Sequence, residues 1–214
     1  MNYQGFIENA YTDAKNGISN IPTDSPVLKI KGMSRAGGRH LLNNLAAYGS
    51  TSLEIGTHQG STLISYLYQN PKEKSFSIDN WSQFGNHKET FKENVDKYLP
   101  ELSQEKLIYF DTDCWKMDLA LIDAPIDFYF YDGRHTKECQ RKALTYYYPV
   151  LNNTFLFCVD DYCKPRWGVA AGTQQGIEEC GFEILAEKVI RSRQPRSFWN
   201  GYYIAFLKKT TPES

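Results

Sequence analysis

The chain has 214 residues, of which 41% are hydrophobic, and a formal net charge of −1. This length suits one α/β domain, and the hydrophobic content is enough for a full core, which excludes a disordered chain. The near-neutral charge gives no general electrostatic reason to bind nucleic acid or an anionic membrane. No apolar run approaches the roughly 20 residues needed to span a bilayer, and residues 1–17 do not resemble a signal peptide. We therefore expect a cytoplasmic protein without a membrane or nucleic-acid partner.

Apolar periodicity and turn residues predict alternating helices and strands. In chain order we expect helices at 3–17 and 35–48, strand 52–56, helix 60–69, strand 75–79, helix 86–98, strand 106–110, helix 114–122, strand 126–131, helix 135–148, strand 154–159, helix 168–180, and strands 182–190 and 201–208. Only a loop joins the last two strands, so the final strand must be antiparallel to its neighbour. This succession predicts a Rossmann-like α/β fold with a seven-stranded, mostly parallel sheet and helices on both faces. Residues 1–50 would form a helical cap on a core of residues 51–208, within a single domain of residues 1–214.

Glycine and acidic residues follow the first two core strands. Glu54 and Gly56 end the first strand, and Gly60 and Ser61 open the next helix, where backbone N–H groups are free to meet a ligand. Gly56 lets the chain turn sharply and lets a ligand approach the backbone. Asp79 ends the second strand, where a carboxylate can accept hydrogen bonds from a ribose diol. The pattern predicts a nucleotide-type cofactor site, with an ordinary strand–turn–helix as the alternative.

Carboxylates also end two later strands. Asp132 follows the fourth strand, and Asp160 and Asp161 follow the fifth, so three carboxylates should converge at one edge of the sheet. Such a cluster is costly unless a cation neutralises it, and oxygen donors without thiolates suit Mg²⁺ or Mn²⁺. His135 lies three residues after Asp132 and is a candidate general base. The alternative is that Asp132 caps the next helix and His135 is a solvated residue of its first turn.

Arginines and tryptophans gather near the loop between the last two strands. If the penultimate strand is parallel to the others, this loop overhangs the carboxyl ends of the sheet. Planar aromatic rings beside arginine suit stacking on a sugar ring or contact with an anionic acceptor. A solvated loop with one tryptophan packed on the sheet is the alternative. The candidate acceptor residues are Arg166, Trp167, Arg191, Arg193, Arg196 and Trp199.

Four motifs resemble those of class I S-adenosylmethionine-dependent methyltransferases, over roughly residues 30–207. The closest likeness is to metal-dependent O-methyltransferases of the catechol O-methyltransferase type and their sugar-modifying relatives. LEIGTHQGST (53–62) is similar to the family motif that carries the methionine part of the cofactor, and Asp79 matches the acidic residue on the ribose hydroxyls. IYFDTDCW (108–115) resembles the strand end that places Asp113 near the adenine, although Thr112 and Cys114 replace the usual glycine and serine. KGMS (31–34) is similar to the stretch that covers the sulfonium.

The resemblance implies an enzyme that moves a methyl group from S-adenosylmethionine to a hydroxyl of a sugar or other small molecule. DGRHTKE (132–138) looks like the D-G-x-H branch, which implies His135 as the base and Asp132, Asp160 and Asp161 as ligands of Mg²⁺ or Mn²⁺. The implied cofactor-binding residues are Met33, Glu54, Gly56, Gly60, Ser61, Asp79, Asp113 and Asp132.

Two other classes of protein stay open at this point. A nicotinamide-dependent oxidoreductase would use a similar sheet but would show GxGxxG and no cluster of three carboxylates. A non-catalytic module would bind the cofactor without turnover. The sequence does not name the acceptor or set the oligomeric state, and a homodimer is compatible with it.

Overall fold

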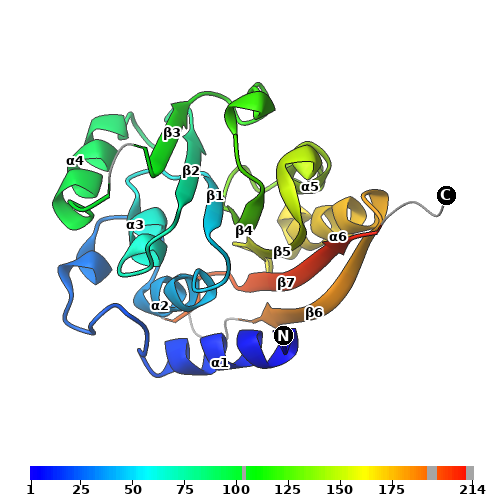
Figure 1. The fold of residues 1–214 in the computed structure, drawn as a ribbon, viewed down its shortest axis with the longest axis horizontal. Coiled ribbons are helices and arrows are strands. Elements are labelled where there is room, and N and C mark those ends of the chain that lie inside the picture. The colour runs from blue at the N-terminus through cyan, green and yellow to red at the C-terminus, as the bar shows by residue number, and fades with distance from the viewer. Residues whose placement is uncertain (103–104, 192–196, 211–214) are drawn as a thin grey trace.

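The computed structural model of the protein describes residues 1–102, 105–191 and 197–210. Its centre is a seven-stranded sheet in the order β3-β2-β1-β4-β5-β7-β6 (Figure 1). The strands are β1 (Thr51–Ile55), β2 (Lys74–Asp79), β3 (Leu107–Asp111), β4 (Ile126–Tyr131), β5 (Leu151–Val159), β6 (Phe182–Ile190) and β7 (Tyr202–Lys209). The ladders from β3 to β5 are parallel, whereas β7 is antiparallel to both β5 and β6. Six strands therefore point the same way, which confirms the predicted Rossmann-like fold.

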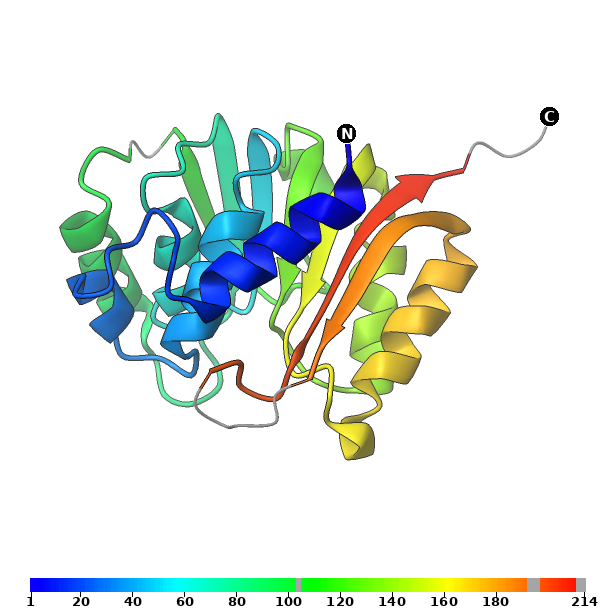
Figure 2. The same ribbon diagram turned by 90° about the horizontal axis from the view of Figure 1, so that it is seen from below.

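Helices cover both faces of the sheet. They are α1 (Tyr3–Lys15), α2 (Ala36–Leu45), α3 (Ser61–Leu67), α4 (Lys88–Tyr98), α5 (Lys137–Thr145) and α6 (Val169–Glu179). Helices α1 and α2 lie on one face, and α5 and α6 lie on the other (Figure 2). No helix in the described ranges has the length and apolar run that crossing a bilayer requires.

The helix predicted at 114–122 is wrong. Only a 3-10 turn, Leu119–Leu121, forms in this stretch. The Asp118 side chain accepts a hydrogen bond from the Ala120 N–H, and Asp113 accepts one from the Trp115 N–H. Aspartate side chains that bond to nearby backbone N–H groups favour turns over a continuous helix.

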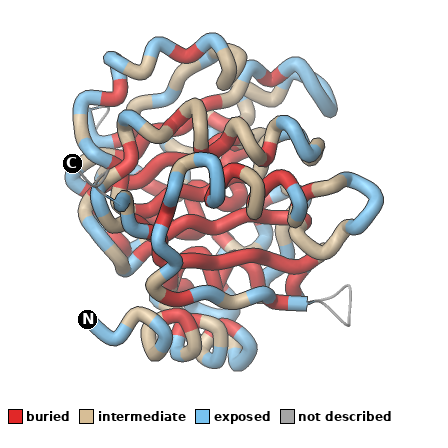
Figure 3. The backbone as a smooth tube through the Cα atoms, turned by 90° about the vertical axis from the view of Figure 1, so that its right-hand side faces the viewer, coloured by how far each residue is buried: buried red, intermediate tan, exposed pale blue. Residues whose placement is uncertain are grey.

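The alternation of side chains along the strands divides the core in two. On β4, Phe128 and Phe130 pack on the side of α1, α2 and α3, whereas Tyr129 and Tyr131 pack on the side of α5 and α6. Successive residues of a strand point to opposite faces, so a strand covered on both faces must be apolar at nearly every position. Figure 3 shows the central strands buried along most of their length.

The topology gathers the segments that follow the parallel strands at one edge of the sheet. Because β6 runs parallel to β5, the chain after Ile190 emerges at this same edge, as predicted (Figure 2). The chain returns to the sheet through residues 197–201 and enters β7. The carboxyl edge of the sheet is therefore where the predicted functional residues come together.

Candidate active site

A cavity of about 680 Å³ opens at the carboxyl edge of the sheet. Segments after β1, β2, β3, β4 and β5 form its walls, together with the segments before α2 and β7. This is the usual ligand position of an open α/β sheet, and the volume lies within the range of roughly 300–1,000 Å³ found for small-molecule sites. The residues predicted from the sequence that line it are Met33, Ser34, Gly56, Ser61, Asp79, Asp113, Asp132, His135, Asp160, Asp161, Trp167 and Trp199.

The turn after β1 depends on glycine. Gly56 has a φ of +91°, and a Cβ at this position would lie 2.2 Å from the Asp132 carbonyl oxygen. Only glycine therefore fits between the ends of β1 and β4. Gly60 has a φ of +83°, and a Cβ there would meet the Phe91 ring at 2.9 Å. Gly60 precedes α3 but is not among the residues that line the cavity.

Glu54 lies beneath this turn and does not line the cavity. Its side chain is 0% exposed, and its Oε1 accepts a hydrogen bond from Thr62 Oγ1 at 2.5 Å. Its Oε2 is buried without a hydrogen-bond partner among the described residues. Burial raises the pKa of Glu54 to about 8, so the carboxyl is mostly protonated at pH 7. Its contact with a cofactor stays a prediction.

Asp79 is fixed by the backbone of its neighbours. Its Oδ2 accepts the His58 N–H at 2.8 Å, and its Oδ1 accepts the Trp81 N–H at 2.7 Å. Trp81 Nε1 in turn donates to the His58 carbonyl at 2.7 Å. A carboxylate has about four lone-pair sites, so each oxygen of Asp79 keeps one for a ligand.

The wall beyond Asp79 follows β3 and is completed by α5. Asp113 Oδ1 accepts the Trp115 N–H at 3.0 Å, and the Lys142 ammonium lies 5.9 Å from the Trp115 ring centre. Cys114 and Cys139 also line this wall. The α5 residues were not predicted from the sequence, because no motif there marks which helical side chains face the cavity.

The opposite end of the cavity holds an imidazole between two carboxylates. His135 Nε2 lies 3.5 Å from Asp132 Oδ1, and His135 Nδ1 lies 3.4 Å from Asp161 Oδ2. These are ion-pair distances, and Nε2 makes no hydrogen bond to a described residue. The ring stacks on Trp167 with centres 5.5 Å apart. Asp160 is 7% exposed, and its Oδ1 accepts the Asp161 N–H at 2.8 Å.

The crowding of charge shifts the titration of this group. Burial raises the pKa of Asp160 well above its usual range, and the Asp132 and Asp161 carboxylates raise it further. Burial also raises the pKa of Asp132, although His135 opposes this rise. Burial alone would lower the pKa of His135, but the two flanking carboxylates outweigh it and raise the pKa. Within residues 1–102, 105–191 and 197–210, no three His, Cys, Asp or Glu side chains already form a ligand group, so the cation stays a prediction.

Asn200 is a cavity residue that was not predicted from the sequence. Its side-chain amide donates a hydrogen bond to Asp161 Oδ1, and its carbonyl accepts the Cys163 N–H at 3.0 Å. Asn200 and Asp161 both have a φ of +57°, in the left-handed region that few residues other than glycine adopt. The Asn200-Gly201 dipeptide, which is typical of left-handed turns, was a usable signal.

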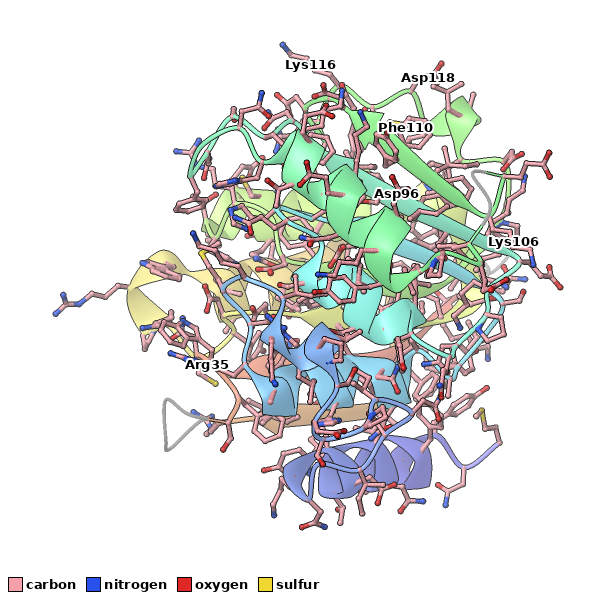
Figure 4. The ribbon with its side chains drawn as sticks, turned by 90° about the vertical axis from the view of Figure 1, so that its left-hand side faces the viewer. Arg35, Asp96, Lys106, Phe110, Lys116 and Asp118 are labelled. Atoms are coloured by element: carbon pink, nitrogen blue, oxygen red, sulfur yellow. The ribbon has the colours of Figure 1, made fainter. Side chains whose placement is uncertain are left out.

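Two tryptophans form the outer wall at this end. Trp167 and Trp199 are 43% and 38% exposed. A cation covers each ring: the Arg35 guanidinium lies 4.7 Å from the Trp199 ring centre, and the Lys164 ammonium lies 5.6 Å from that of Trp167. Arg35 directly precedes α2 (Figure 4). Of the arginines predicted for the acceptor, Arg166 and Arg191 are exposed and do not line the cavity, and Arg193 and Arg196 lie outside the described residues.

The strand order, the antiparallel β7 and the cavity at the carboxyl edge define a Rossmann-like methyltransferase fold. A family model described as "Methyltransferase domain" matches residues 53–162, which is more than half of the chain. The chain therefore belongs to this family of methyltransferase domains. Membership argues against the nicotinamide-dependent oxidoreductase that the sequence left open. Among curated proteins, none matches the sequence significantly.

Solved structures share the fold at low sequence identity. The O-methyltransferase from Bacillus cereus in complex with SAH is 12% identical with a TM-score of 0.60, covering 97% of this chain and 93% of its own. The SAH-bound methyltransferase from Podospora anserina is 11% identical with a TM-score of 0.60, covering 95% and 88%. A proposed RNA methyltransferase from Pyrococcus horikoshii is 12% identical with a TM-score of 0.59, covering 97% and 98%. These likenesses establish the fold, and the acceptor must be argued from the site.

Proposed function

We propose that the protein is an S-adenosylmethionine-dependent O-methyltransferase that methylates a hydroxyl of a sugar, a glycan or another small molecule with the help of a divalent cation. One observation carries this proposal. A single cavity joins a wall with Asp79 and Asp113 to an end where His135 lies between Asp132 and Asp161. The first part suits a nucleoside, and the second suits the removal of a proton from a hydroxyl.

The residues present fit the cofactor. Asp79 keeps lone pairs free for a ribose diol, and Gly56 leaves room for a ligand to approach the backbone. The cavity of about 680 Å³ has space for a nucleoside cofactor and a small acceptor together. When bound, S-adenosylmethionine supplies an electrophilic methyl group on sulfur. The SAH in the Bacillus cereus and Podospora anserina proteins supports the same ligand class here.

His135 is the proposed base for the acceptor proton. Its imidazole lies in the cavity, and carboxylates face both of its nitrogens at 3.5 and 3.4 Å. The charges of Asp132 and Asp161 stabilise the imidazolium that forms when the proton arrives. Stacking on Trp167 holds the ring in place and limits the access of water on one side.

The proposal also includes a divalent cation bound at the carboxylates of Asp132, Asp160 and Asp161. Asp132, Asp160 and Asp161 offer only carboxylate oxygens, the donor type that Mg²⁺ and Mn²⁺ prefer. Burial raises the pKa of Asp132 in spite of His135, and burial and the neighbouring carboxylates raise that of Asp160, so a further positive charge would be stabilised beside them. These three residues would hold the cation, which would lower the pKa of an acceptor hydroxyl.

The outer wall supports a sugar or another polyol as the acceptor. Trp167 and Trp199 stay 43% and 38% exposed although cations and, for Trp167, the His135 ring cover part of them, and sugar rings stack on such aromatic surface beside polar groups. Asn200 lies next to them and adds an amide to this wall.

Two measurements test the proposal in sequence. Calorimetry with S-adenosylhomocysteine should show binding with and without excess chelator. Transfer of a radiolabelled methyl group to a panel of neutral sugars, polyols and catechols should then require Mg²⁺ or Mn²⁺. Binding without transfer to any acceptor would indicate the non-catalytic module, and full transfer in excess chelator would refute the cation.

A further inference from the structure

Residues 27–34, here called the strap, are clamped by a buried arginine. Arg39 on α2 is 2% exposed. Its Nη1 donates to the Val27 carbonyl at 2.9 Å, and its Nη2 donates to the Ile30 carbonyl at 2.7 Å. Its Nε donates to Ser34 Oγ at 2.9 Å. One side chain thus holds both ends and the middle of the strap.

The strap packs directly on the first residue of α3. A Cβ at Gly32 would lie 2.2 Å from Ser61 Oγ and 3.6 Å from Arg39 Nη2. Ser34 Oγ is 3.1 Å from Ser61 Oγ, and both serines line the cavity. The guanidinium is therefore separated from the cavity by a single layer of two hydroxyl groups.

The charge of Arg39 has no acidic partner in the described part of the chain. Its acceptors are carbonyl and hydroxyl oxygens, and no carboxylate pairs with it. Burial lowers the pKa of Arg39 to about 10. Placing a cation in a buried site without an anion is costly, so an anion close by would be stabilised. The Ser34–Ser61 pair marks the place in the cavity where the guanidinium is nearest.

We infer that Arg39 is a positioning residue for the cofactor, and that its charge and the Ser34 and Ser61 hydroxyls select a ligand with a carboxylate at this end of the cavity. The inference rests on the proposed S-adenosylmethionine binding. It assigns the carboxylate of the amino-acid part to the strap and leaves the nucleoside part to Asp79. The site should therefore discriminate against sulfur nucleosides that lack a carboxylate.

A matched pair of ligands tests this selection. S-adenosylhomocysteine carries the carboxylate, whereas S-adenosyl-3-thiopropylamine keeps the amino group and lacks only the carboxylate. Calorimetry on the full chain should show that Arg39→Met weakens S-adenosylhomocysteine by roughly ten- to hundredfold, because the buried guanidinium attracts the carboxylate across one layer of hydroxyl groups, and leaves the second ligand nearly unchanged. Arg39→Lys should restore part of the preference because it restores the charge.

Lys72 provides the control for stability. It is another buried cation, 4% exposed, whose ammonium is held by the carbonyls of Ala46, Tyr48 and Gly49, and it does not line the cavity. Lys72→Met should lower the melting temperature without changing the ratio of the two affinities.

The outcomes separate this inference from the proposed function. An unchanged affinity ratio in folded Arg39→Met would overturn the inference and leave Arg39 as a clamp only. If Arg39→Met does not fold, Ser34→Ala decides instead, with a smaller loss expected for S-adenosylhomocysteine alone; an equal loss for both ligands would overturn the inference. Wild-type protein that binds neither ligand would refute the proposed function and the inference with it.

Discussion

The carboxylates at the two ends of the cavity have different surroundings. At the end proposed for the cofactor, here called the cofactor end, Asp79 and Asp113 accept the backbone N–H groups of Trp81 and Trp115, each two positions later, and Asp79 also accepts the N–H of His58 from the turn after β1. At the end proposed for the acceptor, here called the acceptor end, Asp132, Asp160 and Asp161 lie close to one another and to His135, and the pKa values of Asp132 and Asp160 are raised.

This difference indicates that one end is suited to binding and the other to catalysis. Backbone N–H groups hold the cofactor-end carboxylates in a fixed orientation, so this end is arranged for binding before a ligand arrives. The acceptor end contains charges that are costly together, and a proton, a cation or a polarised hydroxyl would reduce that cost. Substitutions at the cofactor end should therefore change affinity, and those at the acceptor end should change rate.

The largest effect is expected from His135→Ala. If His135 is the base, the variant should keep its cofactor affinity and lose roughly 10²–10⁴ in rate. The loss should shrink as pH rises, because hydroxide can then take the acceptor proton. Single-turnover rates against pH measure this, with thermal melts as the control for folding. An unaltered pH–rate profile would contradict the role of His135 as the base. Lys164 would then be the next candidate base, and Lys164→Ala is the corresponding test.

Glu54 lies beneath the cofactor end and, unlike Asp79 and Asp113, accepts no backbone N–H group from the described residues; burial leaves its carboxyl without a compensating charge. Its folded-state pKa of about 8 is raised above the ordinary 4.5, so its contribution to stability is complete below about 4.5 and is lost as pH rises through 8. Glu54→Gln removes this titration. Between pH 5 and pH 9, the unfolding free energy of the variant should gain about 2–4 kcal/mol relative to the wild type. Urea unfolding of the ligand-free proteins measures it, and parallel pH profiles would show that Glu54 does not titrate in this range.

Asp79→Ala tests the cofactor end directly. Loss of hydrogen bonds to a neutral ribose should weaken S-adenosylhomocysteine binding by roughly 1–3 kcal/mol. Asp111→Ala is the matched control, since Asp111 also lies at the end of a cofactor-side strand but pairs with Lys88 outside the cavity. Calorimetry showing equal affinities for the two variants would remove Asp79 from the site.

The smallest effect is expected from Asn200. Asn200→Gly keeps the left-handed backbone and removes the amide that bonds to Asp161. The rate should fall roughly tenfold with cofactor affinity unchanged, because Asp161 loses one hydrogen bond that orients it towards His135. Asn200→Ala should show the same loss with a lower melting temperature, since alanine is strained at this φ. A wild-type rate in Asn200→Gly would limit the role of Asn200 to the turn.

Most of the fold could be predicted because local pattern and topology agree. Alternating helical and strand-like stretches define the element order, and parallel strands bring Asp79, Asp132 and Asp160 to one edge whatever the details of packing. The error at 114–122 came from the Asp113 and Asp118 side chains, which bond to their own backbone.

The parts of the site that could not be predicted depend on tertiary packing. Arg35 reaches the ring of Trp199 from a segment far away in sequence, and Lys142 faces the cavity only because of the rotation of α5. The motif that predicts Glu54 at the cofactor gave no sign that its side chain would be buried and bonded to Thr62 of α3. Sequence patterns indicate which strand end a residue follows, but they do not give the depth at which a side chain lies.

The position of β7 has a consequence for synthesis. β7 is the last described strand along the chain, yet it lies between β5 and β6, and it is the only strand of the described part that pairs with β6. A growing chain that ends before Tyr202 therefore has β6 without a sheet partner, with free N–H and C=O groups that another chain can pair with. The cofactor end can form from residues made earlier, whereas Trp199 and Asn200 reach the cavity only when β7 inserts. The wall proposed for the acceptor is thus the last part of the cavity to be completed as the chain is made.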